Sequence, residues 1–394
     1  MKAGWPTRNL GDVCKVIGGG TPPKDKTEYY SGEIPWATVR DMRSDLITKT
    51  ECKITKAAVK GSSTNIIPSG NVVIATRVGL GKICLLGQDT AINQDLRGIV
   101  PNDLKILSVK FLFWWFKNIA DVIVAEGTGA TVQGVKLPFV KSLPLPLPPL
   151  PEQHRIVNIL DKSFEGIATA KANAEKNLLN AKALFESHLQ SVFTQRGEGW
   201  EDQTLDQVCV VERGSSPRPI KKYFTTAADG VNWIKIGDTE EGGKYVYSTA
   251  QKITPAGAKQ SRFVKEGDFI LTNSMSYGRP YIMKTSGYIH DGWFVLRLNI
   301  SIDIDYFYYL LSSNYVQSQF AQLASGSVVK NISGDLVKRA ILPIPPLNQQ
   351  HIIVEKLLGI SAETQRLESI YQQKLTALDD LKKSLLHQAF SGDL

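Results

Sequence analysis

Two lysines follow a glycine in a way that suggests a phosphate-binding loop, in Gly81-Lys82-Ile83 and in Gly243-Lys244-Tyr245. A P-loop also needs a glycine five residues before this glycine and a serine or threonine after the lysine, because its amides and hydroxyl hold phosphate and Mg²⁺. Both segments lack these residues. The sequence therefore predicts no nucleotide-binding loop.

The other candidates for catalysis or metal binding are isolated. The five histidines have no second ligand at helical spacing; they are His154, His188, His290, His351 and His387. A nuclease-like set could combine Asp41 or Asp45 with Glu51-Cys52-Lys53, but an E-x-K triplet is common and the second half of the chain does not repeat it. The D/N-P-P-Y/F tetrapeptide of amino-methyltransferases is missing from the sequence. We therefore expect no catalytic centre and no metal in this chain.

The composition is typical of a globular protein with more than one unit. The chain has 394 residues, of which 42% are apolar, and this exceeds one typical domain. Residues 1–10 lack the apolar stretch of a signal peptide, and the longest large-apolar cluster, 111–116, lies between two lysines. The four cysteines form no CxxC pair, which favours reduced and mostly buried thiols; they are Cys14, Cys52, Cys84 and Cys209. We expect a cytoplasmic protein.

The charge of the chain permits a polyanionic partner. The formal net charge is +8 and the isoelectric point is about 9.1. Residues 1–197 contain 25 Lys and Arg against 17 Asp and Glu, whereas residues 198–394 contain 21 of each kind. The excess of positive charge therefore belongs to the first half, and by itself it does not require nucleic-acid binding.

The second half of the chain repeats the first. Gly4-Trp5 and Val13-Cys14 recur 195 residues later, and after a two-residue insertion the offset becomes 197. The pairs at this offset include Trp36 with Trp233, Asp41 with Asp238, Gly70 with Gly267, Gly81 with Gly278, and Gly129 with Gly326. Solenoid repeats span roughly 20 to 50 residues, so a repeat of this length predicts a whole domain plus a connector in each copy.

Each copy combines short strands with amphipathic helices. Alternating apolar residues flanked by turn formers predict strands in 71–76 and 268–273, and apolar residues at helical spacing predict helices in 112–123 and 307–320. The aromatic run Trp114-Trp115-Phe116 could stack on bases, but an aromatic stripe on a helix is more often core packing, which we favour. The domains are therefore expected to be mixed α/β.

A proline-rich connector and a long helix end each copy. In residues 143–151 repeated prolines fix φ and remove amide donors, which excludes helix and central strand. Pro151 and Glu152 suit the first turn of a helix, and Gly166 is the only glycine or proline between residues 152 and 196. Such a helix would be about 60 Å long at roughly 1.5 Å per residue.

Heptad stripes run along both long helices. The first stripe is Leu160, Phe164, Ile167, Lys171, Ala174, Leu178, Ala181, Phe185, His188 and Val192. The second is Ile353, Leu357, Ile360, Thr364, Leu367, Tyr371, Lys374, Leu378, Leu381, Leu385 and Gln388. We expect the two helices to pair antiparallel within the chain, with one domain near each end and a pseudo-twofold relation. The expected core of the pair is Leu160, Ile167, Leu178, Phe185, Leu357, Leu367, Leu378 and Leu385. A helical linker, or a coiled coil between separate chains, is the alternative.

These features resemble one known family. Two variable α/β domains each close with an L-P-x-P-P-L-x-x-Q motif and a long helix, here in residues 145–153 and 342–350, with a glycine-rich turn in Gly127-Thr128-Gly129 and Ser325-Gly326-Ser327. This is similar to the specificity subunit of type I restriction-modification systems, and the resemblance covers the whole chain. The second copy has Asn348-Gln349 in place of Pro151-Glu152.

The resemblance implies a role in host defence without catalysis by this chain. Residues 1–147 and 198–344 would be two target-recognition domains, each reading one half of a bipartite DNA site. Residues 148–197 and 345–394 would be connectors whose helices form a coiled coil and set the spacer. The partners would be two DNA methyltransferase subunits and two motor-nuclease restriction subunits, which would bind S-adenosylmethionine, ATP and Mg²⁺. Half-sites about one helical turn apart, roughly 34 Å, would meet two readers on the same face of DNA.

The residues expected to contact DNA carry cations or amides in loops, because these groups bind phosphates and base edges. In the first domain they are Lys24, Arg40, Arg77, Lys82, Asn93 and Gln94. In the second they are Arg218, Lys221, Lys222, Asn273, Tyr277, Arg279, Lys330 and Asn331. For each of them a solvated charge or a turn-capping amide is the alternative. The alternatives for the whole chain are a tandem nuclease or methyltransferase, and a coiled-coil adaptor that binds only protein.

Overall fold

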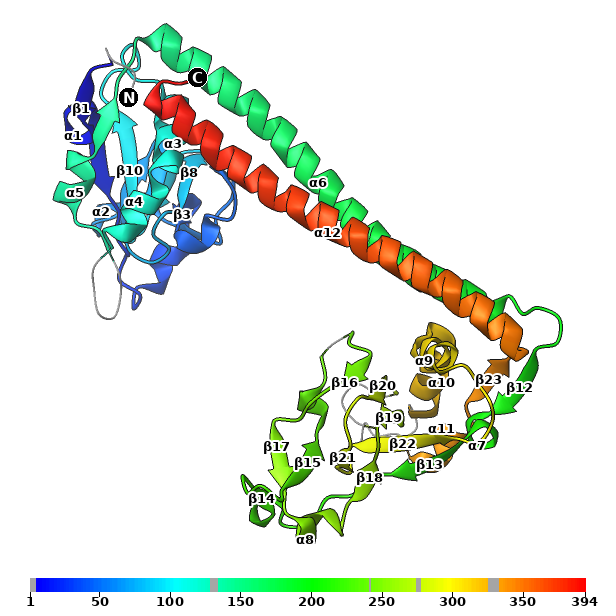
Figure 1. Ribbon diagram of the computed structural model, residues 1–394. Coiled ribbons are helices and arrows are strands. Elements are labelled where there is room, and N and C mark those ends of the chain that lie inside the picture. Colours follow the sequence, from blue (N-terminus) through cyan, green and yellow to red (C-terminus); the bar gives the residue numbers. More distant parts are fainter. Residues whose placement is uncertain (1–4, 128–133, 241, 274–277, 325–332) are drawn as a thin grey trace. The chain divides into compact units, whose positions relative to one another are not determined.

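The structure, a computed structural model, describes residues 5–127, 134–240, 242–273, 278–324 and 333–394 (Figure 1). The chain divides into two compact units. Unit 1 combines residues 1–175 with residues 373–394, and unit 2 is residues 176–372. Each unit therefore contains one α/β domain and parts of both long helices.

The domain of unit 1 contains a five-stranded sheet in the order β2-β10-β7-β8-β4. Its strands are β2 (Cys14–Gly18), β10 (Leu96–Pro101), β7 (Val72–Ala75), β8 (Ile83–Leu86) and β4 (Leu46–Ile47). All neighbours are antiparallel except β4 and β8, which are parallel. All four residues of β7 are buried, as expected for a central strand whose side chains are covered on both faces. The strand predicted in residues 71–76 is confirmed.

A second, four-stranded sheet packs against this one. Its order is β5-β3-β9-β6, formed by β5 (Cys52–Ile54), β3 (Ile34–Ala37), β9 (Thr90–Ile92) and β6 (Asn65–Ile67). One apolar cluster contains Ile67 and Ile92 from this sheet together with Val73 and Cys84 from the first. The two sheets therefore share one core.

Helices cover the other face of the five-stranded sheet. Helix α3 (Val109–Asn118) contributes a run of six buried residues from Phe111 to Phe116, which pack with Val72, Ile74 and Ile83. The core interpretation of the aromatic run is thus confirmed. Short helices α1 (Leu10–Val13), α2 (Lys56–Lys60), α4 (Ala120–Ala125) and α5 (Leu137–Ser142) complete the domain.

The proline-rich connector is extended, as predicted. Within it β11 (Pro144–Pro146) pairs only with β1 (Thr7–Asn9) in an antiparallel two-stranded ladder. Proline is compatible with such an edge position because it lacks an amide donor.

Unit 2 repeats this architecture. The five-stranded sheet has the order β13-β22-β19-β20-β16. It contains β13 (Cys209–Arg213), β22 (Trp293–Leu298), β19 (Phe269–Thr272), β20 (Pro280–Met283) and β16 (Tyr245–Val246). Register is conserved as well as order, because Leu96 faces Ala75 in unit 1 and Trp293 faces Thr272 in unit 2. The tandem duplication predicted from the sequence is therefore present in the fold.

The second sheet of unit 2 has one additional strand. Its order is β14-β17-β15-β21-β18, with β14 (Phe224–Thr225), β17 (Gln251–Ile253), β15 (Val231–Ile234), β21 (Gly287–Ile289) and β18 (Arg262–Val264). The two-stranded ladder also recurs, as β12 (Glu201–Thr204) with β23 (Ile341–Ile344). The helices of this domain are α7 (Leu205–Val208), α8 (Pro255–Ala258), α9 (Ile304–Ser312), α10 (Asn314–Ala324) and α11 (Gly334–Lys338).

Two of the repeated glycine pairs have a backbone reason. Gly70 and Gly267 adopt φ of 79° and 88°, and Gly81 and Gly278 adopt 83° and 71°. Side chains other than glycine rarely adopt this left-handed conformation. The turns on either side of β7 and β19 therefore require the same residue in both copies.

Each connector ends in a helix of 45 residues, α6 (Leu150–Thr194) and α12 (Leu347–Ser391). At 1.5 Å per residue each is about 68 Å long. Leu150 and Leu347 are repeat partners, so the replacement of Pro151-Glu152 by Asn348-Gln349 does not move the helix start. Within the described ranges, no helix is both long enough and apolar enough to cross a membrane.

The two long helices pair antiparallel. In unit 1, Arg155 near the start of α6 donates to the backbone oxygen of Leu394 at 2.7 Å, and Lys171 pairs with Asp379 at 2.7 Å. In unit 2, Leu189 near the end of α6 belongs to one apolar cluster with Leu357 near the start of α12. Each end of α6 thus meets the opposite end of α12. The rod shape and the pseudo-twofold relation stay predictions.

The residues expected in the helix core are buried to different degrees. Leu160, Ile167 and Leu357 are buried, whereas Leu178, Phe185, Leu367, Leu378 and Leu385 are partly buried. The prediction for the C-terminal part of the second heptad stripe was wrong, because Lys374, Leu381 and Gln388 are exposed. Leu375 and Lys382 are partly buried instead. An α-helix drifts by about 20° per heptad against a strict 3.5-residue repeat, so the stripe moves by one position.

The glutamine of the repeated motif fastens each helix to its domain. The Gln153 side chain is buried; it accepts from the Ser108 amide at 2.9 Å and donates to the oxygens of Ile106 at 2.8 Å and Pro148 at 2.9 Å. Gln350 accepts in the same way from the Asp303 amide, at 2.8 Å. The motif is therefore a structural element where each helix begins.

Candidate nucleic-acid interface

Three loops meet at the ends of β2, β7 and β9 in unit 1. They are residues 19–26, 76–82 and 93–95, and we call them the first loop cluster. Gly20 donates its amide to Ile92 at 3.0 Å, and Thr76 donates to Asp95 at 2.8 Å. The strand order brings these distant segments together, because β9 lies in one sheet while β2 and β7 lie in the other.

Asp95 organises the first loop cluster. Its carboxylate accepts from the Asn93 carboxamide at 3.0 Å and lies 3.6 Å from the Arg77 guanidinium. The Asn93 oxygen in turn accepts from the Asp95 amide at 3.1 Å. Gln94 accepts a hydrogen bond from the Thr21 hydroxyl. The cluster therefore exposes the Arg77 cation and the Gln94 carboxamide on a turn that hydrogen bonds hold in place.

The predicted residues of the first domain divide into three groups. Arg77 and Gln94 are exposed within the cluster, whereas Asn93 is only 6% exposed and both polar atoms of its carboxamide hydrogen-bond to Asp95. Lys24 and Lys82 are exposed in the loops of the same cluster. Arg40 is exposed in a short 3-10 helix (Val39–Asp41), outside the three loops of the cluster.

Unit 2 forms an equivalent cluster, the second loop cluster. It comprises residues 214–219, 290–292 and the described residues 273, 278 and 279. Asp291 is its centre, because its carboxylate accepts from the Ser216 hydroxyl at 2.8 Å and from Arg218 at 3.3 Å. Asn273 donates to the Asp291 backbone oxygen at 2.6 Å and is 1% exposed. The loops that follow the same three strands thus meet in both copies.

The predicted residues of the second domain also differ in exposure and position. Arg218 is exposed in the cluster, and Lys221 and Lys222 are exposed in the 3-10 helix that follows, Ile220–Lys222. Asn273 belongs to the cluster but is buried. Tyr277, Lys330 and Asn331 lie outside the described residues, as does most of each glycine-rich turn.

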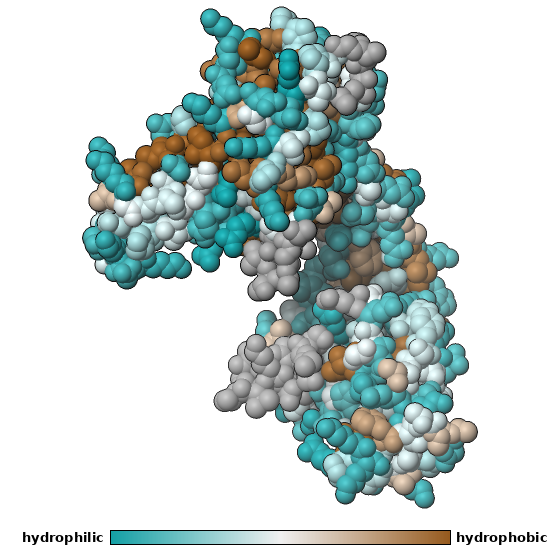
Figure 2. Space-filling model, turned by 90° about the vertical axis from the view of Figure 1, so that its left-hand side faces the viewer, coloured by the Kyte–Doolittle hydropathy of each residue, from teal (hydrophilic) through white to brown (hydrophobic). Residues whose placement is uncertain are grey.

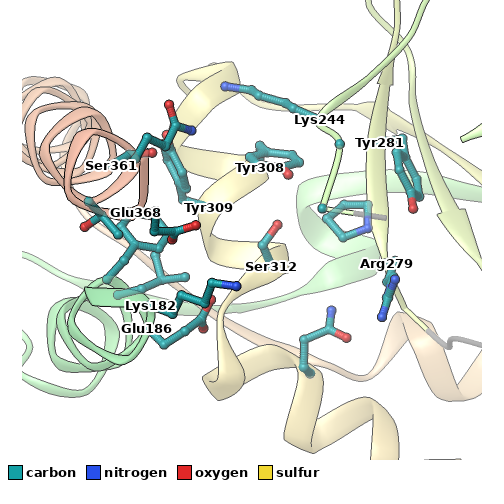
Figure 3. Close-up of a pocket in the computed structure, with 18 residues that line it drawn as sticks. Lys182, Glu186, Lys244, Arg279, Tyr281, Tyr308, Tyr309, Ser312, Ser361 and Glu368 are labelled. Carbon is teal, nitrogen blue, oxygen red and sulfur yellow. The ribbon is translucent and has the colours of Figure 1, made fainter. Parts of the chain in front are cut away.

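Arg279 directly precedes β20 at the edge of the second loop cluster. It lines a cavity of about 720 Å³ between the domain of unit 2 and the neighbouring parts of α6 and α12 (Figure 3). Lys182, Glu186 and Glu368 point into this cavity from the two helices. The structure therefore associates Arg279 with the helices of its own unit.

Sequence reasoning missed the two aspartates and two arginines of the clusters. Arg97 donates to the Gln94 oxygen at 3.2 Å, and Arg213 donates to the Asp291 oxygen at 3.3 Å. Asp95 lies in the turn that leads from one sheet to the other between β9 and β10, and Asp291 lies in the corresponding turn between β21 and β22. A comparison of this turn between the two copies could have identified these aspartates, because the turn contains an acidic residue in both copies.

The pKa shifts of Arg97 and Asp291 reflect burial and charged neighbours in the two loop clusters. Burial and the nearby Arg77 lower the pKa of the Arg97 guanidinium, against the opposing effect of Asp95. Burial would raise the pKa of Asp291, but the hydrogen bond from Ser216 and the charges of His290 and Arg218 bring it below its ordinary value. Asp291 is therefore charged at neutral pH and holds Arg218 in place.

The nuclease-like candidates have structural partners. Asp41 accepts from the amides of Thr38 at 2.7 Å and Glu51 at 2.8 Å, and Asp45 pairs with Lys117 at 2.6 Å. Among the described residues, no group of three or more His, Cys, Asp or Glu side chains could hold a metal ion. Cys14, Cys84 and Cys209 are buried and Cys52 is exposed, and all four are free thiols.

The face drawn in Figure 2 shows a hydrophobic band on the domain of unit 1 and a mostly hydrophilic surface on the domain of unit 2. Protein–DNA interfaces are more polar than protein–protein interfaces. The two loop clusters and the repeated fold define a class of protein in which two copies of one polar-surfaced α/β domain are each attached to paired long helices.

The family follows from the sequence profile described as "Type I restriction modification DNA specificity domain", which matches residues 2–180 and 197–377. These two stretches contain most of both copies. The chain therefore belongs to this family, and its function is the sequence specificity of a type I restriction-modification complex towards DNA.

Two curated relatives carry the same designation. The type I restriction enzyme MjaIX specificity subunit of Methanocaldococcus jannaschii is 23% identical over 420 residues, covering 99% of this chain and 93% of that protein. The EcoR124I/EcoR124II specificity subunit of Escherichia coli is 36% identical over 165 residues, or 40% of each chain.

Solved structures share the fold. A chain from work on complex assembly and conformational transition of the type I R-M system matches with a TM-score of 0.81 and 21% identity, covering 100% of this chain and 99% of that chain. The HsdS subunit from Thermoanaerobacter tengcongensis matches with a TM-score of 0.68 and 21% identity, covering 100% and 98%. The mixed α/β fold with two repeated domains and long helices is thereby confirmed.

Proposed function

We propose that each α/β domain reads one half of a bipartite DNA site and that α6 and α12 set the spacer between the halves. The observation that carries the proposal is the equivalence of the two loop clusters, which combine exposed arginines with polar turn residues on one strand topology. Arginine recognises guanine edges and phosphates with two parallel hydrogen bonds. Two such readers on one chain suit a target with two separate halves.

The partners in this proposal are two methyltransferase subunits and two motor-nuclease subunits. Support comes from the relatives, which are named specificity subunits of type I restriction enzymes, and from the structural neighbour described for assembly of that system. In such a complex S-adenosylmethionine, ATP and Mg²⁺ bind the partner subunits. The complex acts on cellular DNA, so a cytoplasmic location belongs to the same proposal.

The long helices offer the surface for docking the methyltransferase subunits. Large apolar side chains remain exposed on them, Leu179 at 68% and Leu184 at 56% on α6, and Leu358 at 45% on α12. Exposed apolar groups arranged along a helix are typical of surfaces that bind another protein.

We also propose that the chain has no catalytic activity of its own. The sequence contains neither a P-loop nor an amino-methyltransferase tetrapeptide, and the acidic residues of the nuclease-like set hold backbone amides or form ion pairs. Among the described residues, no group of catalytic side chains supports the alternative of a tandem nuclease or methyltransferase.

The test is a methylation assay with S-adenosylmethionine. The purified chain alone is expected to transfer no methyl group to DNA, and the methyltransferase subunit alone is expected to lack a defined target. Mixed together, they are expected to methylate adenine in one bipartite sequence. Methyl transfer by the isolated chain would contradict the proposal, as would methylation by the mixture at a single undivided sequence.

A further inference from the structure

The turns before β10 and β22 carry different residues at equivalent positions of the two loop clusters. Asn93 corresponds to His290, and Asp95 corresponds to Gly292. In unit 1 the Asp95 amide donates to the Asn93 carboxamide oxygen at 3.1 Å. In unit 2 the Gly292 amide donates to Nδ1 of His290 at 2.7 Å. The same hydrogen bond therefore closes both turns, with an amide oxygen as acceptor in one and an imidazole nitrogen in the other.

The imidazole of His290 is packed closely into the second domain. A β-carbon at Gly292 would lie only 2.2 Å from Cε1 of His290, so the ring occupies space that glycine leaves open. The ring also lies beside the buried indoles of Trp233 and Trp293, 6.3 Å from each between ring centroids. The His290 side chain is 20% exposed. This packing holds Nδ1 towards the turn.

The turn of residues 290–292 contacts both other loops of the second loop cluster. Asp291 pairs with Arg218 at 3.3 Å, and this arginine belongs to the loop of residues 214–219. The backbone oxygen of Gly292 accepts from the amide of Asn273 at 2.9 Å. A change in the hydrogen bond to His290 therefore reaches the exposed arginine of the cluster.

The acceptor role of His290 requires a neutral imidazole. A neutral ring keeps one nitrogen as an acceptor, whereas an imidazolium carries N–H groups on both nitrogens. Nε2 also faces a backbone donor, the Ile236 amide, at 3.3 Å. The neutral ring can accept from one of these two amides, and the shorter contact assigns the acceptor to Nδ1. A protonated ring turns two donors towards two donors, which leaves the Gly292 amide without its acceptor.

The charged groups around the ring act in both directions. They are Asp291 of its own turn, Lys235 and Asp238 of the segment after β15, and Arg218, which pairs with Asp291. Burial lowers the pKa of His290 below its ordinary value, against the opposing effect of Asp291 and Asp238, and Lys235 lowers it further. Asp291 does not replace the lost hydrogen bond, because its Oδ1 is 3.6 Å from Nδ1 and already accepts from the Ser216 hydroxyl.

The direction of the pH effect follows from this shift. The folded chain holds the pKa of His290 below the ordinary histidine value of about 6.5. The neutral ring therefore stabilises the turn fully above that pH, and this contribution is lost as the pH falls through the lowered value. The carboxamide of Asn93 does not titrate, so the first turn keeps its acceptor over the same range.

We propose that His290 is a positioning residue of the second loop cluster, and that it makes recognition of one half-site depend on pH while the other half-site does not. His290 acts through the turn of residues 290–292 and through Arg218, without a base contact of its own. This inference rests on the proposed function as a bipartite reader.

The experiment replaces the titrating acceptor by the acceptor of the first copy. His290→Asn is compared with the parent, with His290→Ala, and with His351→Asn, which makes the same substitution at an exposed histidine of the same unit. The methyltransferase complex is titrated at about pH 7.5 and about pH 5.5, on either side of the ordinary histidine pKa. The duplexes carry the cognate site, a scrambled first half or a scrambled second half. Discrimination at a half-site is the ratio of the affinities for the cognate and the scrambled duplex.

In the parent, discrimination at one half-site is expected to fall about tenfold at the lower pH, while discrimination at the other changes less than about twofold. His290→Asn is expected to keep both discriminations at both pH values, which a purely space-filling role of the imidazole would not produce. His290→Ala is expected to show the reduced discrimination at both pH values, and His351→Asn is expected to behave like the parent.

The isolated chain provides a readout that does not depend on DNA. The Cε1 proton resonance of His290, identified by its loss in His290→Asn, is expected to titrate below the ordinary histidine value. Over the same pH range the amides of residues 214–219 and 290–292 are expected to lose protection against hydrogen exchange, because local opening follows the loss of the turn.

An equal response of both half-sites to pH in the parent would overturn the inference, and so would a response that persists in His290→Asn. Stronger discrimination at the lower pH would also overturn it, because the attraction between the imidazolium and Asp291 would then outweigh the lost acceptor. A complex that recognises no bipartite site at either pH would contradict the proposed function instead. The exchange data from the isolated chain would then still show whether His290 holds the second loop cluster.

Discussion

Arg77 and Asn93 lie in the same loop cluster but differ in what their polar atoms already hold. The Asn93 carboxamide is buried and exchanges hydrogen bonds with Asp95, whereas the Arg77 guanidinium is half exposed and only 3.6 Å from Asp95. Arg77 therefore has donors left for DNA. Asn93 instead supports the turn that carries the neighbouring side chains.

Replacing Arg77 by Ala is expected to weaken binding to cognate DNA without changing the melting temperature of the chain. A bidentate contact to a base contributes about 1 to 3 kcal/mol of discrimination, whereas the loss of a phosphate contact weakens all sequences alike and reduces the salt slope by about one unit. Titration of cognate and scrambled duplexes at several salt concentrations distinguishes the two cases. Unchanged affinity for both duplexes would exclude Arg77 from the interface.

Asn93→Ala is expected to act mainly through stability. Removal of the carboxamide leaves the buried side of Asp95 without a donor, which costs about 1 to 3 kcal/mol of unfolding free energy. Chemical denaturation of the variant measures this, with Gln94→Ala as the control because Gln94 is exposed in the same turn. Full native stability combined with loss of specific DNA binding would show that Asn93 contacts bases directly.

Residue-level prediction reached only part of this site. The sequence indicates which loops carry cations and amides, and Arg77, Gln94 and Arg218 are exposed in the two loop clusters, while their contact with DNA stays a prediction. Whether an amide is buried depends on hydrogen bonds from segments distant in the chain, as for Asn273 and Asp291, which are 18 residues apart. Asp95 and Asp291 were missed for the same reason, because an acidic residue in a loop resembles an ordinary solvated charge.

At the level of elements, the two long helices were the most predictable part of the chain. Prolines before the helices and heptad stripes along them mark both start and pairing face, and Leu150 and Leu347 begin helices of equal length. The second stripe departs from strict heptads where Leu375 and Lys382 replace Lys374 and Leu381 at the interface. Periodicity alone does not show that drift, because it depends on how the helices wind around each other.

If these helices act as a ruler, a matched insertion of one heptad in both is expected to lengthen the spacer. Seven residues add about 10.5 Å, which corresponds to about three base pairs at 3.4 Å each. The insertions belong after Ala172 and after Ser369, which are repeat partners. Mapping of methylated adenines is expected to show the same half-site bases at the greater distance.

An insertion in α6 alone serves as the control. It shifts the two apolar stripes out of register and is expected to destabilise the pair rather than to produce a new spacer. Altered half-site bases at an unchanged distance in the matched variant would contradict the ruler role.

At the scale of the whole molecule, the duplication was visible in the sequence because glycines, tryptophans and the proline-rich motif recur at nearly constant offsets. The strand order and register of the two domains agree with that repeat. The sequence did not reveal how the copies differ in attachment to their helices.

The central claim is that recognition is divided between two independent readers, and exchange of one reader tests it most directly. Residues 1–147 are replaced by the corresponding region of a relative with a different target, and methylated adenines are mapped in DNA from cells carrying the complete system. The account predicts that one half of the target changes while the other half persists. A change of both halves after this single exchange would contradict it.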